Sequence, residues 1–328
     1  MTEPVAPISI AVLIPCYNEE VAVGHVVAGF RAALPSAAIH VFDNNSSDAT
    51  AQVARESGAH VHRVTAQGKG HVVRRMFADV EADIYVLVDG DDTYDPKSAG
   101  AMIDMLITDR LDMVVGTRVS DAKSAYRPGH RFGNALLTGM VARIFGRAFT
   151  DILSGYRVFS RRFVKSFPAI SSGFEIETEL TVHALQLIMP CGELETPYGS
   201  RREGSLSKLN TYRDGWRILM TIQQLLRYEM PLRFFSIVAA IFAGISVLLG
   251  IPLLIEFIET GLVPRLPTAV LAMGLMLLAA LSLASGFILD NVTRGRREVR
   301  HLFYLRNAGP PLDRRKEKRD RNGETKAV

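Results

Sequence analysis

The chain is 328 residues long, with 48% hydrophobic residues, 22% charged residues and a formal net charge of +4 at pH 7. This length exceeds that of a mini-protein and allows two average domains, or one large α/β domain with an appendage. Two stretches, residues 234–255 and 266–289, contain no Asp, Glu, Lys or Arg. Each reaches the roughly 20 residues that a helix needs to cross a bilayer, which argues against a freely soluble protein.

The positive charge is concentrated near the C-terminus. Residues 294–321 contain 11 Lys or Arg and 4 Asp or Glu, which leaves the rest of the chain slightly acidic. Because these basic residues follow an apolar run, they fit a cytoplasmic membrane flank attracted to anionic lipid better than nucleic-acid binding. Arg227 and Arg233 precede the first run, whereas the connection between the runs is net acidic, with Glu256 and Glu259. We therefore expect an integral membrane protein, in the plasma membrane if bacterial or archaeal, with both ends cytoplasmic and no nucleic-acid partner.

The first 120 residues alternate short apolar runs with longer amphipathic ones. The apolar runs predict strands, and the amphipathic segments predict helices that begin near Glu19, Ser47, Lys69 and Pro96. Such alternation is typical of an α/β domain in which helices cover both faces of a mainly parallel sheet. The expected strands are Ile8–Ile14, Ile39–Phe42, His60–Val64, Ile84–Val88 and Met113–Val115.

The chain between this region and the apolar runs is less regular. It predicts a helix at Phe174–Leu187, a short strand near Leu194–Tyr198, and then an amphipathic helix that lies either at a membrane interface or on the soluble core. We expect four parts in all. They are a catalytic domain (1–210), the interfacial helix (211–231), two transmembrane helices (232–292) and a basic, partly disordered cytoplasmic tail (293–328).

Polar side chains follow three of the predicted strands, at the point where each strand ends. They are Asn18-Glu19-Glu20, Asp43-Asn44-Asn45 and Asp89-Gly90-Asp91-Asp92. Because ligands bind beyond the carboxyl ends of parallel strands, these three loops predict one shared site. Asp89 and Asp91 can share a hard divalent cation, which in turn prefers phosphate oxygens, and Gly90 lets the chain turn between them.

Other phosphate chemistries find less support in the sequence. The segment from Asp89 to Thr93 also fits the Asp-x-Asp-x-Thr pattern of haloacid-dehalogenase-type phosphatases, but the acidic motif that belongs well downstream is missing. Neither a P-loop nor a dinucleotide-binding glycine pattern follows the first strand. Gly68-Lys69-Gly70 precedes a predicted helix, where it is either an anion-binding helix N-terminus or an ordinary solvent loop.

Five motifs share their order and spacing with a known enzyme family. They are Leu13 to Glu20, Asp43 to Thr50, Gly68-Lys69-Gly70, Asp89-Gly90-Asp91 and Gly116-Thr117-Arg118. Together they resemble family 2 glycosyltransferases of the GT-A fold. Three further segments are similar to the polyprenyl-phosphate branch, which includes dolichol-phosphate mannose synthase and bacterial undecaprenyl-phosphate sugar transferases: Ser154 to Arg157, Gly173 to Glu177, and Tyr198 to Lys208. The resemblance covers about residues 8–230, and the two apolar runs match its membrane-anchored members.

The resemblance implies a nucleotide-sugar site at the strand ends. By similarity, Asp89 and Asp91 would bind Mg²⁺ or Mn²⁺ on the diphosphate of the donor. The dolichol-phosphate mannose enzymes often have a Gln two residues past the second Asp, where this chain has Thr93, so the resemblance does not extend to a third protein ligand. The residues implied to bind the nucleotide sugar are Pro15, Tyr17, Asn18, Glu19, Asp43, Lys69, Asp89, Gly90 and Asp91.

A lipid phosphate acceptor must be held by cations, and arginine matches the geometry of phosphate. The candidate acceptor-phosphate ligands are Arg118, Arg131, Arg202, Ser205 and Lys208. Asp151 and Glu177 are candidates for a base or for groups that orient the sugar, with capping and a solvated helix face as their alternative roles. The expected catalytic set is Asp91, Arg118, Arg131, Asp151 and Glu177.

We expect inverting, metal-dependent transfer of one sugar from a nucleotide sugar to undecaprenyl or dolichyl phosphate at the cytoplasmic membrane face. A UDP-sugar is the first expectation for the donor, and GDP-mannose is the second. Because a phosphate monoester is already anionic near neutral pH, positioning and charge neutralisation are expected to dominate over base catalysis. A family 2 transferase with another membrane or polysaccharide acceptor, and a non-catalytic membrane scaffold, are the alternatives. The sequence leaves homo-oligomer formation open.

Overall fold

The structure is a computed structural model that describes residues 7–119, 139, 149–168, 176–200, 220 and 227–311. The chain forms two compact units. The first, here named the sheet unit, comprises Met1–Gly215 together with Arg300–Val328, and the second, the hairpin unit, comprises Trp216–Val299. The amphipathic helix expected at 211–231 falls almost entirely outside the described residues.

A seven-stranded sheet forms the centre of the sheet unit. Its strands lie in the order β3-β2-β1-β4-β6-β5-β7, and β6 alone runs antiparallel to its two neighbours. The mainly parallel sheet predicted from the sequence is confirmed. The strands are β1 (Ile10–Cys16), β2 (Ala38–Asp43), β3 (His60–Arg63), β4 (Ile84–Leu87), β5 (Met113–Val119), β6 (Arg157–Ser160) and β7 (Cys191–Pro197).

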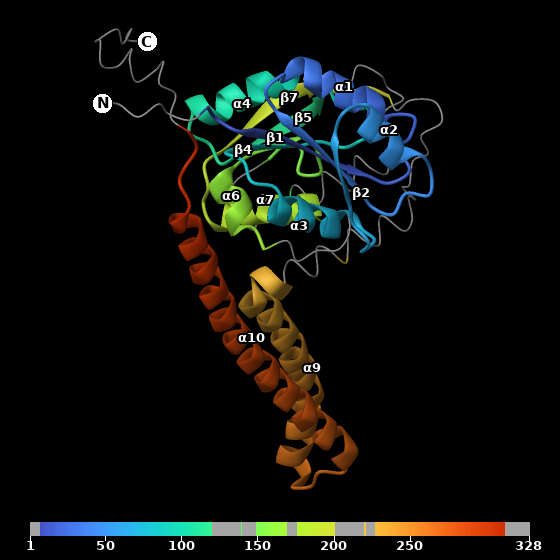
Figure 1. The fold of residues 1–328 in the computed structure, drawn as a ribbon. Coiled ribbons are helices and arrows are strands. Elements are labelled where there is room, and N and C mark those ends of the chain that lie inside the picture. The colour runs from blue at the N-terminus through green and yellow to red at the C-terminus, as the bar shows by residue number, and fades with distance from the viewer. Residues whose placement is uncertain are drawn as a thin grey trace, which may run out of the picture. The chain divides into compact units, whose positions relative to one another are not determined.

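Helices cover both faces of this sheet, with α1, α2 and α4 on one face and α3, α6 and α7 on the other (Figure 1). Because both faces are covered, central strands such as β4 are buried at every position and therefore apolar throughout. The four helix starts expected in the first half of the chain each lie within four residues of the observed ones. The helices are α1 (Val23–Ala33), α2 (Thr50–Glu56), α3 (Lys69–Asp79), α4 (Ser98–Thr108), α6 (Arg161–Ser166) and α7 (Ile176–Gln186).

The sequence pattern does not predict β6 or α6. The four residues of β6 begin with Arg157 and end with Ser160, so a charged and a polar residue interrupt the apolar pattern. Both are fully buried, because each has hydrogen-bond partners inside the sheet unit. The hydroxyl of Ser160 donates to Asp112 over 2.6 Å, and it also accepts from the backbone N–H of Phe163 to cap α6.

Asp112, which precedes β5 and is fully buried, joins the end of α10 (Leu266–Arg306) to the rest of the sheet unit. Its carboxylate pairs with both sides of the Arg162 guanidinium, at 2.5 and 2.7 Å. Tyr304 donates its hydroxyl to the same carboxylate over 2.9 Å, and Arg162 lies 4.6 Å from the centre of the Tyr304 ring. Arg300 donates to Gln186 of α7 over 2.7 Å. The last turns of α10 are therefore part of the sheet unit.

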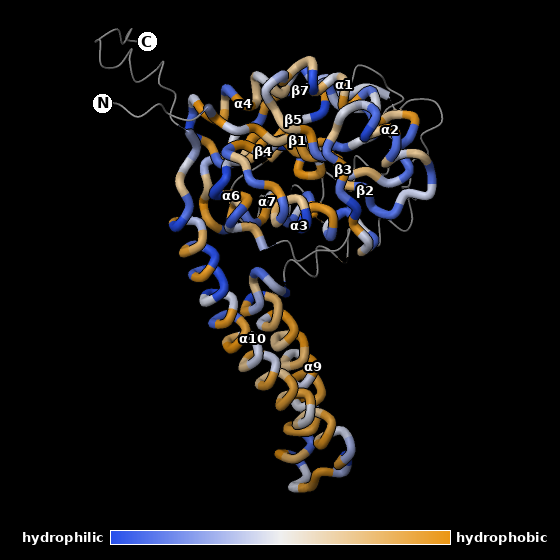
Figure 2. Tube along the Cα trace, viewed as in Figure 1, coloured by the Kyte–Doolittle hydropathy of each residue, from blue (hydrophilic) through white to orange (hydrophobic). Residues whose placement is uncertain are grey.

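The hairpin unit consists chiefly of α9 (Pro231–Thr260) and the larger part of α10. Both helices are long and apolar enough to cross a membrane, with mean hydropathies of 2.6 and 2.1 over 18 residues. Figure 2 shows hydrophobic colouring along α9 and the first part of α10, and more hydrophilic residues toward the end of α10. The two apolar runs expected to cross a bilayer lie inside these helices.

Mostly small residues line the contact between α9 and α10. Buried positions recur at every seventh residue on each helix, and the Ser246 hydroxyl donates to the Ala272 carbonyl over 2.6 Å. Small side chains let two apolar helices approach closely, so van der Waals packing helps to hold the hairpin together. The recurring buried residues are Ala239, Ser246 and Leu253 on α9, and Ala272, Ala279 and Gly286 on α10.

Candidate functional site

The loops after β1 and β2 are tied to each other by reciprocal hydrogen bonds. The backbone N–H of Asn18 donates to Ser46 Oγ over 2.9 Å, and the Asn18 side chain accepts from the N–H of Ser47 over 2.9 Å. The N–H of Glu19 donates to Thr50 Oγ1 over 2.8 Å. Asn18 has a φ of 53°, a left-handed conformation that asparagine tolerates well. The two loops therefore form one structure at the carboxyl edge of the sheet.

Three of the expected nucleotide ligands, Pro15, Tyr17 and Asp43, lie at this edge. The parallel register places Asp43 beside Cys16, which stands between Pro15 and Tyr17 in the chain. Tyr17 is 38% exposed, whereas Asp43 is 5% exposed and accepts a hydrogen bond from the N–H of Ser46 over 3.1 Å. The structure thus brings these expected ligands together.

Asn44 fixes the segment that leads into α3. Its buried side-chain amide donates to the carbonyls of Val64 and Ala66, over 3.1 and 2.7 Å, and accepts from the N–H of Gly68 over 2.7 Å. Lys69 follows directly as the first residue of α3. The end of β2 therefore determines where the Lys69 side chain starts. The sequence places Asn44 in the polar loop after the second strand but gives it no role of its own, because its partners are backbone atoms.

Lys69 joins Asp89, which follows β4, to Glu177 in the first turn of α7. Its Nζ lies 2.5 Å from Asp89 Oδ1 and 2.5 Å from Glu177 Oε1. Burial alone would lower the pKa of Lys69, but the two carboxylates outweigh it and raise the pKa above its usual value. Glu177 is only 5% exposed, so it does not lie on a solvated helix face. Gly68-Lys69-Gly70 is not a solvent loop either, because Lys69 and Gly70 lie in the first turn of α3 and the Lys69 side chain is only 10% exposed.

The Asp89-Gly90-Asp91 turn is closely packed. A Cβ at Gly90 would lie 2.5 Å from Cys16 Sγ, so only glycine fits between the ends of β1 and β4. Asp91 is 5% exposed and accepts a hydrogen bond of 2.6 Å from the Thr93 hydroxyl. Thr93 therefore holds the second carboxylate of the turn.

The donor set around Asp89 fits a metal that is shared with a ligand rather than enclosed by protein. Among the described residues, no group of three or more His, Cys, Asp or Glu could hold a metal ion. The carboxylates of Asp89 and Glu177 nevertheless already surround one cation, the Lys69 ammonium. Mg²⁺ is commonly bound by one or two carboxylates together with substrate phosphates and water. The site therefore suits a divalent cation carried on a diphosphate.

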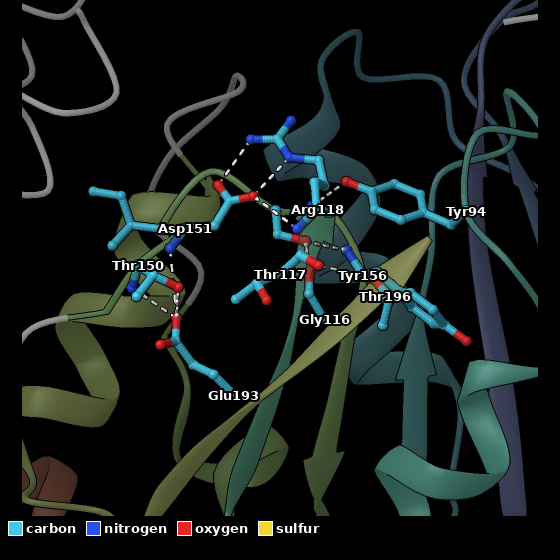
Figure 3. Close-up of polar contacts among 12 residues, drawn as sticks. Tyr94, Gly116, Thr117, Arg118, Thr150, Asp151, Tyr156, Glu193 and Thr196 are labelled. Atoms are coloured by element: carbon cyan, nitrogen blue, oxygen red, sulfur yellow. Dashed lines mark hydrogen bonds and ion pairs between the residues drawn. The ribbon is translucent and has the colours of Figure 1, made fainter. Parts of the chain in front are cut away.

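Arg118 and Asp151, expected to act separately, form one pair (Figure 3). Arg118 Nε lies 2.7 Å from Asp151 Oδ2, and Nη2 lies 2.8 Å from Oδ1. Burial would raise the pKa of Asp151, but the hydrogen bonds and charge of Arg118 lower it below its usual value. The Arg118 guanidinium also lies 5.5 Å from the centre of the Tyr198 ring. The Asp151 carboxylate is therefore a weak base that orients Arg118.

Arg157 supports the loop that carries Asp151. It is fully buried and donates to the carbonyls of Ser154 and Ile152, over 2.9 and 2.6 Å, and to Thr181 Oγ1 of α7 over 2.9 Å. The Arg157 side chain thus connects the loop that carries Asp151 to α7, the helix that carries Glu177. Sequence reasoning quoted Arg157 within a motif but gave it no role. The available signal was a charged residue directly before the apolar pair Val158-Phe159.

The predicted acceptor side is mostly beyond the part of the chain that the structure describes. Arg131, Arg202, Ser205 and Lys208 lie outside it, and Arg118 is the one acceptor candidate within it. The structure therefore brings the expected nucleotide ligands to one edge of the sheet and leaves the phosphate-acceptor ligands as predictions.

The fold and the acidic turn after β4 define a glycosyltransferase domain of the GT-A type. The sequence profile described as Glycosyl transferase family 2 matches residues 11–167. Glycosyltransferase AglJ of Haloferax volcanii is 34% identical over 257 residues, which cover 76% of this chain and 82% of AglJ. The chain belongs to glycosyltransferase family 2, and the enzyme class expected from its motifs is confirmed.

Two other relatives carry more specific names. A dolichyl-phosphate hexose transferase of Haloferax volcanii is 27% identical, over 63% of this chain and 89% of the relative. An undecaprenyl-phosphate mannosyltransferase of Micrococcus luteus is 27% identical, over 53% of this chain and 77% of the relative. The resemblance to the polyprenyl-phosphate branch is confirmed by these relatives.

Solved structures show the same fold. Glucosyl-3-phosphoglycerate synthase from Mycobacterium tuberculosis, crystallised with Mn²⁺, UDP and glucosyl-3-phosphoglycerate, superimposes with a TM-score of 0.54 at 21% identity. The match covers 67% of this chain and 79% of the synthase. This likeness confirms the GT-A architecture of the sheet unit.

Proposed function

We propose that this enzyme transfers one sugar from a nucleotide sugar to a polyprenyl phosphate at the cytoplasmic face of a membrane, with inversion at the anomeric carbon. The main support for this proposal is that two carboxylates, those of Asp89 and Glu177, contact the Lys69 ammonium at the carboxyl edge of a GT-A sheet. The same chain has two helices apolar enough to cross a bilayer.

The acceptor is proposed from the relatives and from the hairpin. Relatives named for transfer to dolichyl phosphate and undecaprenyl phosphate support a polyprenyl phosphate. A lipid of this kind stays in the membrane, so an enzyme with its own membrane helices meets it there without extracting it. The basic residues that follow the second apolar run support a cytoplasmic position for the sheet unit.

The donor is proposed to be a UDP-sugar, with GDP-mannose as the second choice. A solved neighbour that binds UDP with Mn²⁺ supports this order and supports a divalent cation, Mg²⁺ or Mn²⁺. Such a cation would be held by Asp89 and Asp91 and would neutralise charge on the leaving diphosphate. Lys69 is proposed to add a second positive charge beside the same phosphates.

The reaction needs no strong base. An anionic oxygen of the lipid phosphate attacks the anomeric carbon, the bond from that carbon to the diphosphate oxygen breaks, and the nucleoside diphosphate leaves with the electron pair. No proton has to be removed. Asp151 and Glu177 are each ion-paired with a basic side chain, so we assign them to positioning: Asp151 orients Arg118 toward the acceptor phosphate, and Glu177 holds Lys69.

Incubation of the purified full-length chain with undecaprenyl or dolichyl phosphate and a panel of UDP- and GDP-sugars tests this function. We expect one donor to give a glycolipid with Mg²⁺ or Mn²⁺ and none with EDTA, detected by mass spectrometry. Asp89→Asn should lose at least about 100-fold in rate because it removes charge at the leaving group. Asp104→Asn, on the exposed face of α4, is the matched control and should act like wild type. If no donor gives a metal-dependent glycolipid, the proposal is wrong.

A further inference from the structure

Two carboxylates face a single ammonium at Lys69. Both contacts measure 2.5 Å, and the side chains of Lys69, Glu177 and Asp89 are 10%, 6% and 29% exposed. Two like charges that face each other with little water are unfavourable unless a cation stands between them. In the nucleotide-free structure, the Lys69 ammonium is the cation that offsets this repulsion, because it contacts both carboxylates.

A divalent cation on Asp89 would compete with Lys69 for that carboxylate. Charges of +2 and +1 a few ångströms apart repel each other strongly where the surroundings screen less than water does. A nucleoside diphosphate brings negative charge of its own to the same place. Only with the nucleotide present is there enough negative charge to accommodate both cations.

We propose that Lys69 is a resident counter-cation that makes metal binding depend on the nucleotide. In the nucleotide-free protein, its ammonium occupies the Asp89 and Glu177 pair and keeps divalent cations away. When a nucleoside diphosphate binds, the ammonium moves to the phosphate oxygens, which a flexible lysine stem permits, and Asp89 becomes available to a metal. The inference rests on the proposed function, since it takes a diphosphate to be the shared ligand.

Titration of the detergent-solubilised full chain with Mn²⁺ alone, followed by electron paramagnetic resonance of the free ion, tests this inference. We expect Lys69→Met to bind Mn²⁺ at least tenfold more tightly than wild type without nucleotide. Lys165→Met is the matched control, because Lys165 also forms a 2.5 Å ion pair, with Glu81, outside the site. It should bind Mn²⁺ as weakly as wild type.

A second variant protects the test against misfolding of the first. Lys69→Met combined with Glu177→Gln removes the charge on both partners and leaves Asp89 without a carboxylate facing it, so it should also bind Mn²⁺ more tightly than wild type. The inference is overturned if the variants that fold, judged by their thermal midpoints, bind Mn²⁺ no more tightly than wild type. It is also overturned if wild type binds Mn²⁺ equally well with and without UDP or GDP. Neither sugar nor lipid enters this titration, so its failure and a failure of the transfer assay are separate results.

Discussion

Replacement of Gly155 by alanine tests whether the position of Asp89 controls the reaction. A Cβ at residue 155 would lie 2.8 Å from Asp89 Cγ, whereas carbon atoms pack best at about 3.5–4.0 Å. The backbone cannot easily retreat, because the N–H of Gly155 donates to the Tyr94 hydroxyl over 2.9 Å. The Asp89 carboxylate must therefore shift by about 1 Å. A misplacement of about 1 Å can cost on the order of 100-fold in rate, so we expect sugar transfer to fall by about that factor.

The assay is the initial rate of glycolipid formation at saturating donor and metal, measured beside the thermal midpoint. Overpacking of this kind lowers stability by about 1–3 kcal/mol, so the variant should still be folded at assay temperature. Gly100→Ala in α4 is the matched control: its Cβ would meet nothing within 4 Å, and alanine stabilises a helix by about 0.5–1 kcal/mol relative to glycine. A folded Gly155→Ala variant that transfers sugar within about twofold of wild type would refute the reasoning.

Two further predictions concern buried basic residues. The pKa of His183 is lowered from 6.5 to about 3 by burial and by Arg300. Below pH 6.5, His183 is protonated in the unfolded chain but stays neutral in the folded protein, so the free energy of unfolding falls as the pH falls. Between pH 7.5 and 5, the free energy of unfolding of His183→Gln should fall by about 2 kcal/mol less than that of wild type, as measured by urea denaturation. An equal fall in both proteins would contradict the low pKa of His183. Arg157→Met should lower the free energy of unfolding by about 1–3 kcal/mol because Thr181 and two carbonyls lose a buried donor. Arg161→Met, whose side chain is 44% exposed, should change it by less than about 0.5 kcal/mol, and equal effects of the two would count against a special role for Arg157.

The sheet and one side of its site could be predicted from the sequence because their signals are local. A parallel strand covered on both faces reads as an unbroken apolar run, as in Ile84 to Leu87 of β4. The polar residues that follow such a run must lie at the carboxyl edge of the sheet. The strand pattern therefore predicts that Asp43 and Asp89 lie at one edge of the sheet.

The pairings within the site could not be predicted, because they join residues far apart in the chain. Glu177 meets Lys69 through the packing of α7 beside α3, and Asp151 meets Arg118 through a loop with no regular pattern. Arg157 was missed for a related reason: a charged side chain inside a strand is stable only where carbonyls happen to surround it. These ion pairs and the contacts of Arg157 depend on tertiary structure, so no periodic pattern in the sequence indicates them.

The hydrogen bond between Tyr304 and Asp112 changes how the domain order of this enzyme should be understood. The sheet unit stops at Gly215 and continues from Arg300, so the hairpin unit is an insertion in the sequence of the sheet unit. A chain cut after the first stretch, the usual route to a soluble fragment, would lose the hydroxyl that satisfies a fully buried carboxylate. Splicing the first stretch to the returning one through a short linker would keep the domain whole.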